Sequence, residues 1–156
     1  MHPGIYAAET PDRAAYIMAN SGQVVTYREL NEASNRGAHL FRDLGLGLGG
    51  NIAIYMENNA DYLQICWAAH RAGLYYTCIS SYLTAEEVAD IVSDCGAKVF
   101  ITSQAKAEVA MDLAGLMPGG EARLMVGAAI EGYHSYDEAI AAQADGPIGD
   151  EFEGSD

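Results

Sequence analysis

The sequence predicts an α/β fold, in which a parallel sheet carries helices on both faces in the doubly wound arrangement. The first observation is a series of short runs rich in β-branched and aromatic residues, at 52–56, 74–79, 99–102 and 124–126. The second is their spacing, because each interval leaves room for one helix. Repeated strand–helix–strand units of this length favour parallel pairing with right-handed crossovers. The third is a recurring helix-start signal, Ser or Thr followed three residues later by Glu.

A hairpin and a long helix are expected ahead of the sheet. The segments 15–18 and 24–26 flank the turn-rich tetrapeptide 20–23, which favours a β-hairpin. The capping box of Thr26 and Glu29 then begins a helix whose apolar residues recur on one side. Gly45 follows as its C-terminal stop.

The later helices differ in the surface that they should bury. After the capping box of Thr84 and Glu87, apolar residues fall at i, i+3, i+4 and i+7, and Gly96 ends that one-sided helix. The stretch 61–72 carries apolar residues around most of its circumference, so it should be buried on several sides. A last capping box, at 135–138, predicts one more helix.

Length and charge narrow the class of protein. A chain of 156 residues that is 50% hydrophobic and 19% charged forms about one globular domain. Its formal net charge of −14 has the wrong sign for binding a phosphate backbone or an anionic bilayer. The basic residues stand singly in the sequence, so no local basic patch is expected. Nucleic acids and membrane surfaces are therefore not expected as partners.

Cysteine usage and the N-terminus indicate a cytoplasmic protein. Cys66, Cys78 and Cys95 lie in apolar runs and lack the short spacings of metal sites. We expect them to be small buried residues in a reducing compartment. No signal peptide is visible at the N-terminus. The most apolar stretch, 62–79, contains polar and charged residues, so no transmembrane segment is predicted.

The composition changes near the end of the chain. Residues 145–156 contain five acidic residues, no basic residue and several Gly and Pro residues. We expect an α/β unit over residues 1–144 and an exposed, linker-like acidic tail over 145–156.

The glycine-rich segment 45–50 satisfies the pattern G-x-G-x-x-G of dinucleotide-binding turns. That function needs a strand before the turn and a helix after it, so that a helix N-terminus faces the phosphates. Here a helix runs in and a strand runs out. We therefore interpret the segment as a helix stop and loop.

Polar residues at the ends of the predicted strands are the best candidates for a ligand site. Ligands of doubly wound sheets bind beyond the carboxyl ends of the strands. Capping and turn formation explain these residues about as well as ligand binding does. The residues at these ends are Glu57, Asn58, Asn59, Ser80, Ser81, Ser103, Gln104 and Gly127.

No catalytic constellation follows from the residues alone. The four histidines lack the spacing of a shared metal site. His39 and His70 could act as an acid or base, but a helix surface or a local hydrogen bond is the simpler interpretation. A seryl nucleophile signature is absent from the sequence. The sequence therefore predicts no catalytic, cofactor-binding or metal-ligating residue in this chain.

Several blocks of sequence, taken in order, carry a family resemblance. They are TYRELNEASNR at 26–36, IAIYMENN at 52–59, AAHRAGLYY at 68–76, LTAEEV at 83–88 and DCGAKV at 94–99. Together they resemble the N-terminal region of acyl-CoA synthetases, the adenylate-forming enzymes that include fatty-acid and 4-coumarate CoA ligases. Two departures are visible. Gly49-Gly50 replaces the usual Gly-Asp, and Cys78 and Ser80 stand where Pro and Asn are usual.

The resemblance implies an ATP-dependent ligase that converts a carboxylic acid to an acyl-adenylate and then to a CoA thioester. The full-length parent would use ATP, Mg²⁺ and CoA. Family members carry a Ser/Thr/Gly-rich phosphate loop ending in Pro-Lys-Gly, and later an adenine motif, a ribose-binding acid and a C-terminal lysine. None of these strings occurs in this chain. The chain is thus expected to be an N-terminal scaffold, incomplete relative to the full synthetase fold and inactive alone, with residues 145–156 leading toward the phosphate loop.

This interpretation also predicts partners. They are the remainder of the synthetase chain and, in the parent, a fatty or other carboxylic acid. A face that the remainder would cover should be exposed, which predicts self-association of the fragment. Two alternatives stay open: a stand-alone flavodoxin-like binding or interaction module that uses the strand-end polar residues, and a subunit that completes a split synthetase.

Overall fold

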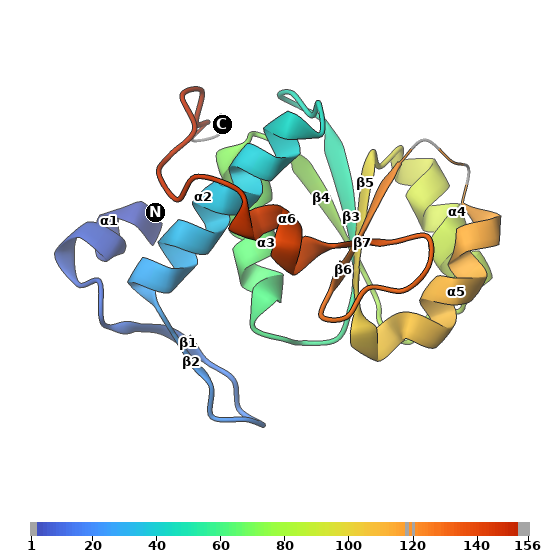
Figure 1. Ribbon diagram of the computed structural model, residues 1–156, viewed down its shortest axis with the longest axis horizontal. Helices are drawn as coiled ribbons and strands as arrows, with labels where there is room; N and C mark the ends of the chain where they lie inside the picture. The colour runs from blue at the N-terminus through green and yellow to red at the C-terminus, as the bar shows by residue number, and fades with distance from the viewer. Residues whose placement is uncertain (1–2, 118, 120, 153–156) are drawn as a thin grey trace.

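The computed structural model describes residues 3–117, 119 and 121–152, and from α2 to β6 its strands are separated by helices (Figure 1). In chain order the elements are α1 (Pro3–Glu9), β1 (Ala14–Ile17), β2 (Val24–Thr26), α2 (Tyr27–Asp43), β3 (Asn51–Tyr55), α3 (Asp61–Arg71), β4 (Tyr75–Ile79), α4 (Ala85–Cys95), β5 (Val99–Ser103), the 3₁₀ turn η1 (Gln104–Lys106), α5 (Ala107–Leu116), β6 (Ala122–Val126), β7 (His134–Ser135) and α6 (Tyr136–Ala141). The short helix α1 has no counterpart among the elements expected from the sequence.

A five-stranded sheet with the order β4-β3-β5-β6-β7 forms the centre of the fold, and each of its neighbouring pairs is parallel. Strand β3 pairs with β4 on one side and with β5 on the other, so the chain reverses its direction of winding at β3. The predicted parallel sheet is confirmed. The predicted hairpin is confirmed as well, because β1 and β2 form a separate antiparallel pair.

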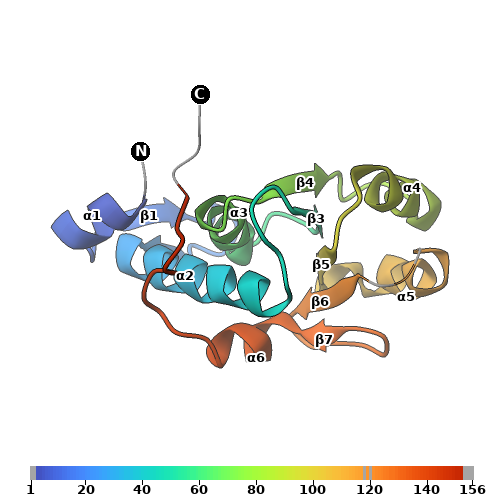
Figure 2. The ribbon, with the colours of Figure 1, turned by 90° about the horizontal axis from the view of Figure 1, so that it is seen from above.

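Two hydrophobic cores lie on opposite faces of the sheet, between it and the helices that Figure 2 shows on either side. Ile52 and Ile54 of β3 point into the core shared with α2, α3 and α6. Ala53 and Tyr55, which alternate with them, point into the core shared with α4 and α5. This alternation follows from the two-residue period of a strand. Helices on both faces confirm the doubly wound class.

The predicted helix starts are formed by local hydrogen bonds. Thr26 with Glu29 and Thr84 with Glu87 each make a reciprocal capping box, at the starts of α2 and α4. At α6 the Ser135 hydroxyl accepts a hydrogen bond from the Glu138 amide. These caps satisfy backbone N–H groups that have no partner inside the helix.

A glycine allows α2 and α3 to approach closely. A Cβ atom at Gly37 would lie 2.6 Å from the Ala68 Cβ atom and 3.2 Å from the Tyr136 hydroxyl oxygen. Real Cβ atoms do not tolerate the first distance. The small residue at position 37 therefore sets how tightly α2 packs against α3 and α6.

Strand β4 lies at the edge of the sheet and is the least covered strand. Tyr75, Tyr76 and Cys78 on it are exposed, whereas Ile79 at its end is buried. The expectation that all cysteines are buried is therefore wrong for Cys78, because an edge strand has a neighbour on one side only. Cys66 is buried and Cys95 is partly buried. None of the helices in the described part of the chain has the length and apolarity needed to cross a membrane.

The described part of the C-terminal segment is docked onto the helices, although most of its residues stay exposed. Residues 145–152 run along α2 and α3 (Figures 1 and 2), and Ile148 is buried in the core between these helices and the sheet. The Phe152 amide donates to the Arg71 carbonyl at 3.0 Å. Composition suggested a linker, but the apolar and acidic side chains of this segment find partners on α2 and α3. The remaining residues, 153–156, lie outside the described residues.

Candidate functional site

The carboxyl ends of β3 and β5 meet at the point where the sheet reverses its winding. In doubly wound sheets this crevice is the usual position for ligands. Ser103, the last residue of β5, donates from its hydroxyl to Glu57 Oε2, just beyond the end of β3. Asn59 Nδ2 donates to Glu57 Oε1 at 3.2 Å. The fold thus brings three of the predicted candidate residues together.

The Glu57 carboxylate is held in its ionised form. Burial by itself would raise its pKa, because a charged group is less stable away from water. Hydrogen bonds from Ser103, from its own backbone amide and from Asn59, together with the positive charge of Lys106, outweigh burial and lower the pKa of Glu57. An ionised carboxylate that already has these partners is a structural acceptor rather than a proton donor.

The other strand-end candidates close the neighbouring loops. Asn59 Oδ1 accepts from the Asp61 and Tyr62 amides, each at 3.1 Å, and so caps the start of α3. The Ser80 carbonyl accepts from the Leu83 amide at 3.2 Å in the turn ahead of α4. Asn59 therefore caps a helix and Ser80 takes part in a turn, as the simpler interpretation of these residues predicts.

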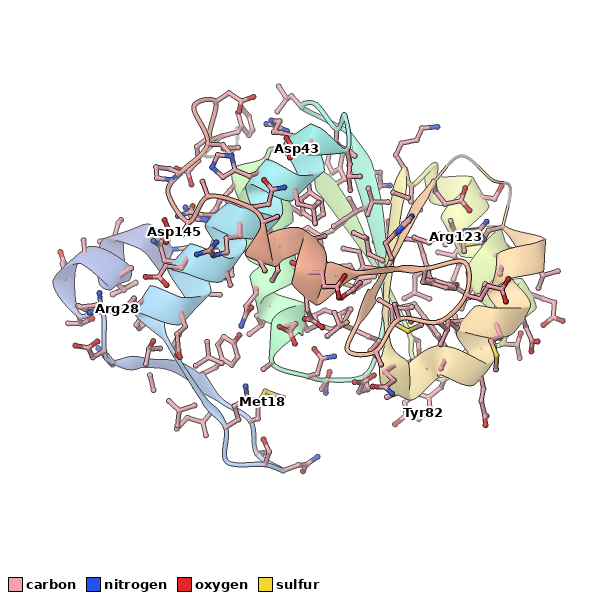
Figure 3. All side chains as sticks on the ribbon, viewed as in Figure 1. Met18, Arg28, Asp43, Tyr82, Arg123 and Asp145 are labelled. Carbon is pink, nitrogen blue, oxygen red and sulfur yellow. The ribbon has the colours of Figure 1, made fainter. Side chains whose placement is uncertain are left out.

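A second set of contacts ties the loops together across the same edge of the sheet. Lys106 Nζ donates to the Ser81 carbonyl at 2.9 Å. Gln104 Oε1 accepts from the Ala128 amide at 3.3 Å, while the Gly127 amide donates to Asp137 Oδ2 at 2.8 Å. Tyr82 projects into solvent at this edge, with 94% of its surface exposed (Figure 3).

Two of the donors at this edge already have partners within the chain. The Gly127 amide donates to the Asp137 carboxylate. The Lys106 ammonium donates to the Ser81 carbonyl, and its charge also stabilises the Glu57 carboxylate. A nucleoside triphosphate at this edge would meet the carboxylates of Glu57 and Asp137 as well as the Lys106 ammonium. Among the described residues, no group of three or more His, Cys, Asp or Glu side chains could hold a metal ion.

The glycine-rich segment 45–50 lies at the other end of the strands, just before the first residue of β3. Gly45 has a φ of 81°, which ends α2, and Gly49 has a φ of 78°. The Gly49 amide donates to the Gly73 carbonyl at 2.8 Å, and β3 follows directly. The interpretation as a helix stop and loop is confirmed, since no helix N-terminus follows the glycines.

A hollow of ≈ 570 Å³ opens beside this segment and the edge strand β4. Its lining is mainly apolar and aromatic, and it contains no acidic or basic side chain other than a histidine. The lining residues are Leu48, Gly49, His70, Gly73, Leu74, Tyr75, Tyr76 and Phe152. The hollow does not include any of the strand-end candidates, so the structure separates it from the crevice at the carboxyl edge.

His39 on α2 and His70 on α3 contact different parts of the chain. His39 Nε2 lies 3.0 Å from the Gly146 carbonyl oxygen and so contacts the C-terminal segment. His70 is exposed at the rim of the hollow, with its ring edge-on to Trp67 at a centroid distance of 5.1 Å. Neither lies with the Glu57 network.

Basic residues that are scattered in the sequence gather where the C-terminal segment crosses α2. Arg36 pairs with Asp145 at 3.3 Å and Arg42 with Asp150 at 3.1 Å, and Figure 3 shows Asp145 beside α2. Each of these two arginines is thus paired with an acidic residue of the C-terminal segment.

Comparison with known proteins identifies the family. Residues 5–145 match the family described as AMP-binding enzyme. The chain belongs to the AMP-binding enzyme family. It is 31% identical over 103 residues to the long-chain-fatty-acid–CoA ligase FadD13 of Mycobacterium tuberculosis (strain ATCC 25618 / H37Rv), which covers 66% of this chain and 20% of that ligase. It is 32% identical over 98 residues to tyrocidine synthase 3 of Brevibacillus parabrevis, which covers 63% of this chain and 2% of that synthase.

Solved structures of acyl-CoA ligases share the fold of this chain. The fatty acyl CoA synthetase of Mycobacterium tuberculosis superposes with a TM-score of 0.79 at 27% identity, over 94% of this chain and 28% of that one. The N-terminal domain of FACL13 from the same organism superposes with a TM-score of 0.80 at 27% identity. The match covers 94% of this chain and 36% of that one. The anthranilate CoA ligase AuaEII superposes with a TM-score of 0.79 at 21% identity, over 92% of this chain and 28% of that one. At this level of identity the likeness shows the fold alone. The chain thus matches the N-terminal part of acyl-CoA ligases and spans only a fraction of their length.

Proposed function

We propose that this chain forms the N-terminal α/β part of an ATP-dependent acyl-CoA ligase. Such a ligase joins a carboxylic acid to AMP with release of pyrophosphate, and then transfers the acyl group to the thiol of CoA. The observation that carries the proposal is the family match over residues 5–145, supported by acyl-CoA ligases among the relatives and the solved structures.

The proposed role of this part is scaffolding. Attack of a carboxylate on the α-phosphate of ATP brings two anions together, so it needs cations or free backbone donors at the phosphates. At the carboxyl edge the Lys106 ammonium and the Gly127 amide already have partners within the chain. The groups that neutralise the phosphates would therefore come from other parts of the ligase, while this part holds the sheet and helps to wall the acyl pocket.

The substrate class proposed for the ligase is a carboxylic acid with a sizeable apolar group, such as a medium or long fatty acid or an aromatic acid. The relative FadD13 is a long-chain-fatty-acid–CoA ligase, and its name supports a fatty acid.

The first test is to read the encoding gene in frame past the codon for Asp156. A Ser/Thr/Gly-rich segment ending in Pro-Lys-Gly within the next few codons would support the ligase. A stop codon at that point would contradict it and favour a stand-alone module or a subunit of a split synthetase.

The second test measures ATP–pyrophosphate exchange by the purified 156-residue chain with a panel of fatty and aromatic acids. We expect no exchange above the rate without acid. Exchange that depends on the acid would contradict the scaffold role. If a separate chain bearing a phosphate loop restores exchange when mixed with this one, the split-synthetase alternative is supported instead.

A further inference from the structure

Strand β4 leaves one side of its backbone without a strand partner. The Tyr75 amide, at the start of β4, donates to the Gly50 carbonyl at 2.8 Å, on the side of β3. Successive residues of a strand direct their N–H and C=O groups to opposite sides, so those of Tyr76 and Cys78 point away from β3. Within the described part of the chain β4 pairs with β3 alone, which leaves these outward groups open to another strand.

The two edges of the sheet are built differently. At the far edge β7 is only two residues long, His134–Ser135, and so short an edge strand gives another chain little to pair with. Strand β4 is five residues long, and its sequence YYTCI contains no charged residue and no proline. Its register with β3 runs without a bulge. Because β4 lacks the devices that protect an exposed edge, its sequence is typical of a strand with neighbours on both sides.

The surface beside this open edge is apolar. The hollow of ≈ 570 Å³ adjoins the start of β4, and its side chains include Leu48, Tyr75 and Tyr76, which are 67%, 71% and 43% exposed. Exposed apolar surface of this kind marks an interaction site. An extended chain paired with β4 would direct alternate side chains to one face of the sheet, where they can enter the hollow.

The C-terminal segment brings the chain to the amino end of β4. The Phe152 amide donates to the Arg71 carbonyl at 3.0 Å, and a Cβ atom at Gly73 would lie 3.2 Å from the Phe152 Cβ atom. Arg71 and Gly73 come just before β4, and Phe152 itself lines the hollow. The ion pair between Arg71 and Glu151 holds the segment there. A later part of the ligase chain would thus be tethered beside the open edge.

We infer that the outer edge of β4, together with the hollow, is a docking surface for an extended strand from the remainder of the ligase. The inference rests on the proposed function, since it needs a longer chain, and this chain spans only a fraction of the acyl-CoA ligases that it matches. The added strand forms hydrogen bonds to the backbone of Tyr76 and Cys78. It also places an apolar side chain in the hollow.

A tethered strand has the advantage over a second copy of this chain. Each copy has a formal net charge of −14, so two copies repel each other. A strand on the same polypeptide acts at an effective concentration on the order of millimolar. Self-association through β4 is therefore a property of the 156-residue chain alone, in which the edge is uncovered.

Hydrogen exchange compares the 156-residue chain with the complete ligase expressed from the gene, each diluted until light scattering shows a monomer. We expect the Tyr76 and Cys78 amides to exchange more slowly in the ligase, by about 100-fold or more. Strand β5 is paired on both sides and should be protected in both proteins, which makes it the internal control. The exposed Cys78 thiol is a second readout, because N-ethylmaleimide should modify it readily in the 156-residue chain and slowly in the ligase.

A charge on the open edge should affect the two proteins differently. Tyr75→Lys should lower the melting temperature of the ligase, because the lysine opposes strand pairing. The same variant should leave the melting temperature of the monomeric 156-residue chain nearly unchanged, because Tyr75 is exposed there. Met111→Lys, at an exposed residue of α5, is the matched control and should change neither.

The outcomes separate this inference from the proposed function. A ligase that catalyses acid-dependent ATP–pyrophosphate exchange, yet exchanges the Tyr76 and Cys78 amides as fast as the 156-residue chain does, would overturn the inference alone. Protection that arises only as the protein concentration rises would assign the edge to a second copy and would also overturn it. A stop codon directly after Asp156 would overturn both.

Discussion

The Arg71 guanidinium donates from Nη1 to Glu151 Oε1 at 2.6 Å, which ties α3 to a segment 80 residues later in the chain. The arginine side chain is 3% exposed. Its Nε donates to the Ser34 hydroxyl at 2.9 Å and its Nη2 to Asn31 Oδ1 at 2.6 Å, so α2 completes the site. A buried cation is tolerated when its donors are paired in this way. Burial lowers the pKa of Arg71 and the Glu151 carboxylate opposes that change, and the group stays charged.

Replacing Arg71 should destabilise the fold and release the C-terminal segment. Arg71→Met would leave Glu151 without its cation and Ser34 and Asn31 without their donor, and we expect a loss of about 2–4 kcal/mol in the free energy of unfolding. Urea denaturation measures this loss. Arg28→Met is the control, because its pair with Asp12 is exposed and should contribute about 0–1 kcal/mol. Equal losses for the two variants would contradict the role given to Arg71.

Two helical glycines should respond in opposite directions to the same substitution. Gly37→Ala places a methyl group against Ala68, and we expect it to destabilise by about 1–3 kcal/mol through overpacking. Gly115→Ala in α5 meets nothing within 4 Å. It should stabilise by up to about 1 kcal/mol, because alanine favours the helix. Thermal unfolding of both variants checks the pair, and a stabilised Gly37→Ala would show that α2 and α3 are not in close contact.

The carboxylate at the end of β3 predicts a dependence of stability on pH. Because the pKa of Glu57 is lowered in the folded chain, its ionised form stabilises the fold above the unfolded pKa of about 4.3. This contribution is lost as the pH falls through the lower, folded pKa. We expect Glu57→Gln to be less stable than the wild type at pH 7 and to show a smaller decrease in stability on acidification.

The matched control for this position is Glu108→Gln, an exposed carboxylate on α5. Urea denaturation at pH 7 and near pH 3 measures both variants. An unchanged acid dependence in Glu57→Gln would show that the hydrogen bonds from Ser103 and Asn59 do not favour the ionised form.

The edge of β4 predicts self-association. Its outer N–H and C=O groups have no strand partner among the described residues, and Tyr75 is 71% exposed. Exposed, uncharged edge strands pair with other chains, and a lysine on the edge opposes that pairing. We expect a dimer or larger species at high concentration by light scattering, and a shift toward monomer in Tyr75→Lys. Tyr82→Lys, at an exposed residue outside the strand, should have little effect.

The sequence by itself determined the local features of this protein. The capping boxes at Thr26 and Thr84 and the stop at Gly45 depend on neighbours a few residues apart, so their patterns are visible in the sequence itself. The family blocks are likewise contiguous, and the family match over 5–145 confirms the resemblance that they carry.

The tertiary structure alone decided the features that join distant residues. Strand order places Glu57 beside Ser103 and leaves Cys78 on an open edge. The burial of Arg71 and the docking of Glu151 depend on each other, because a cation enters the interior only where an anion and polar groups meet it. Composition describes an acidic, glycine-containing segment correctly, but its docking depends on ion pairs with arginines that only the packing of α2 and α3 brings together, Arg36 and Arg42 on α2 and Arg71 on α3.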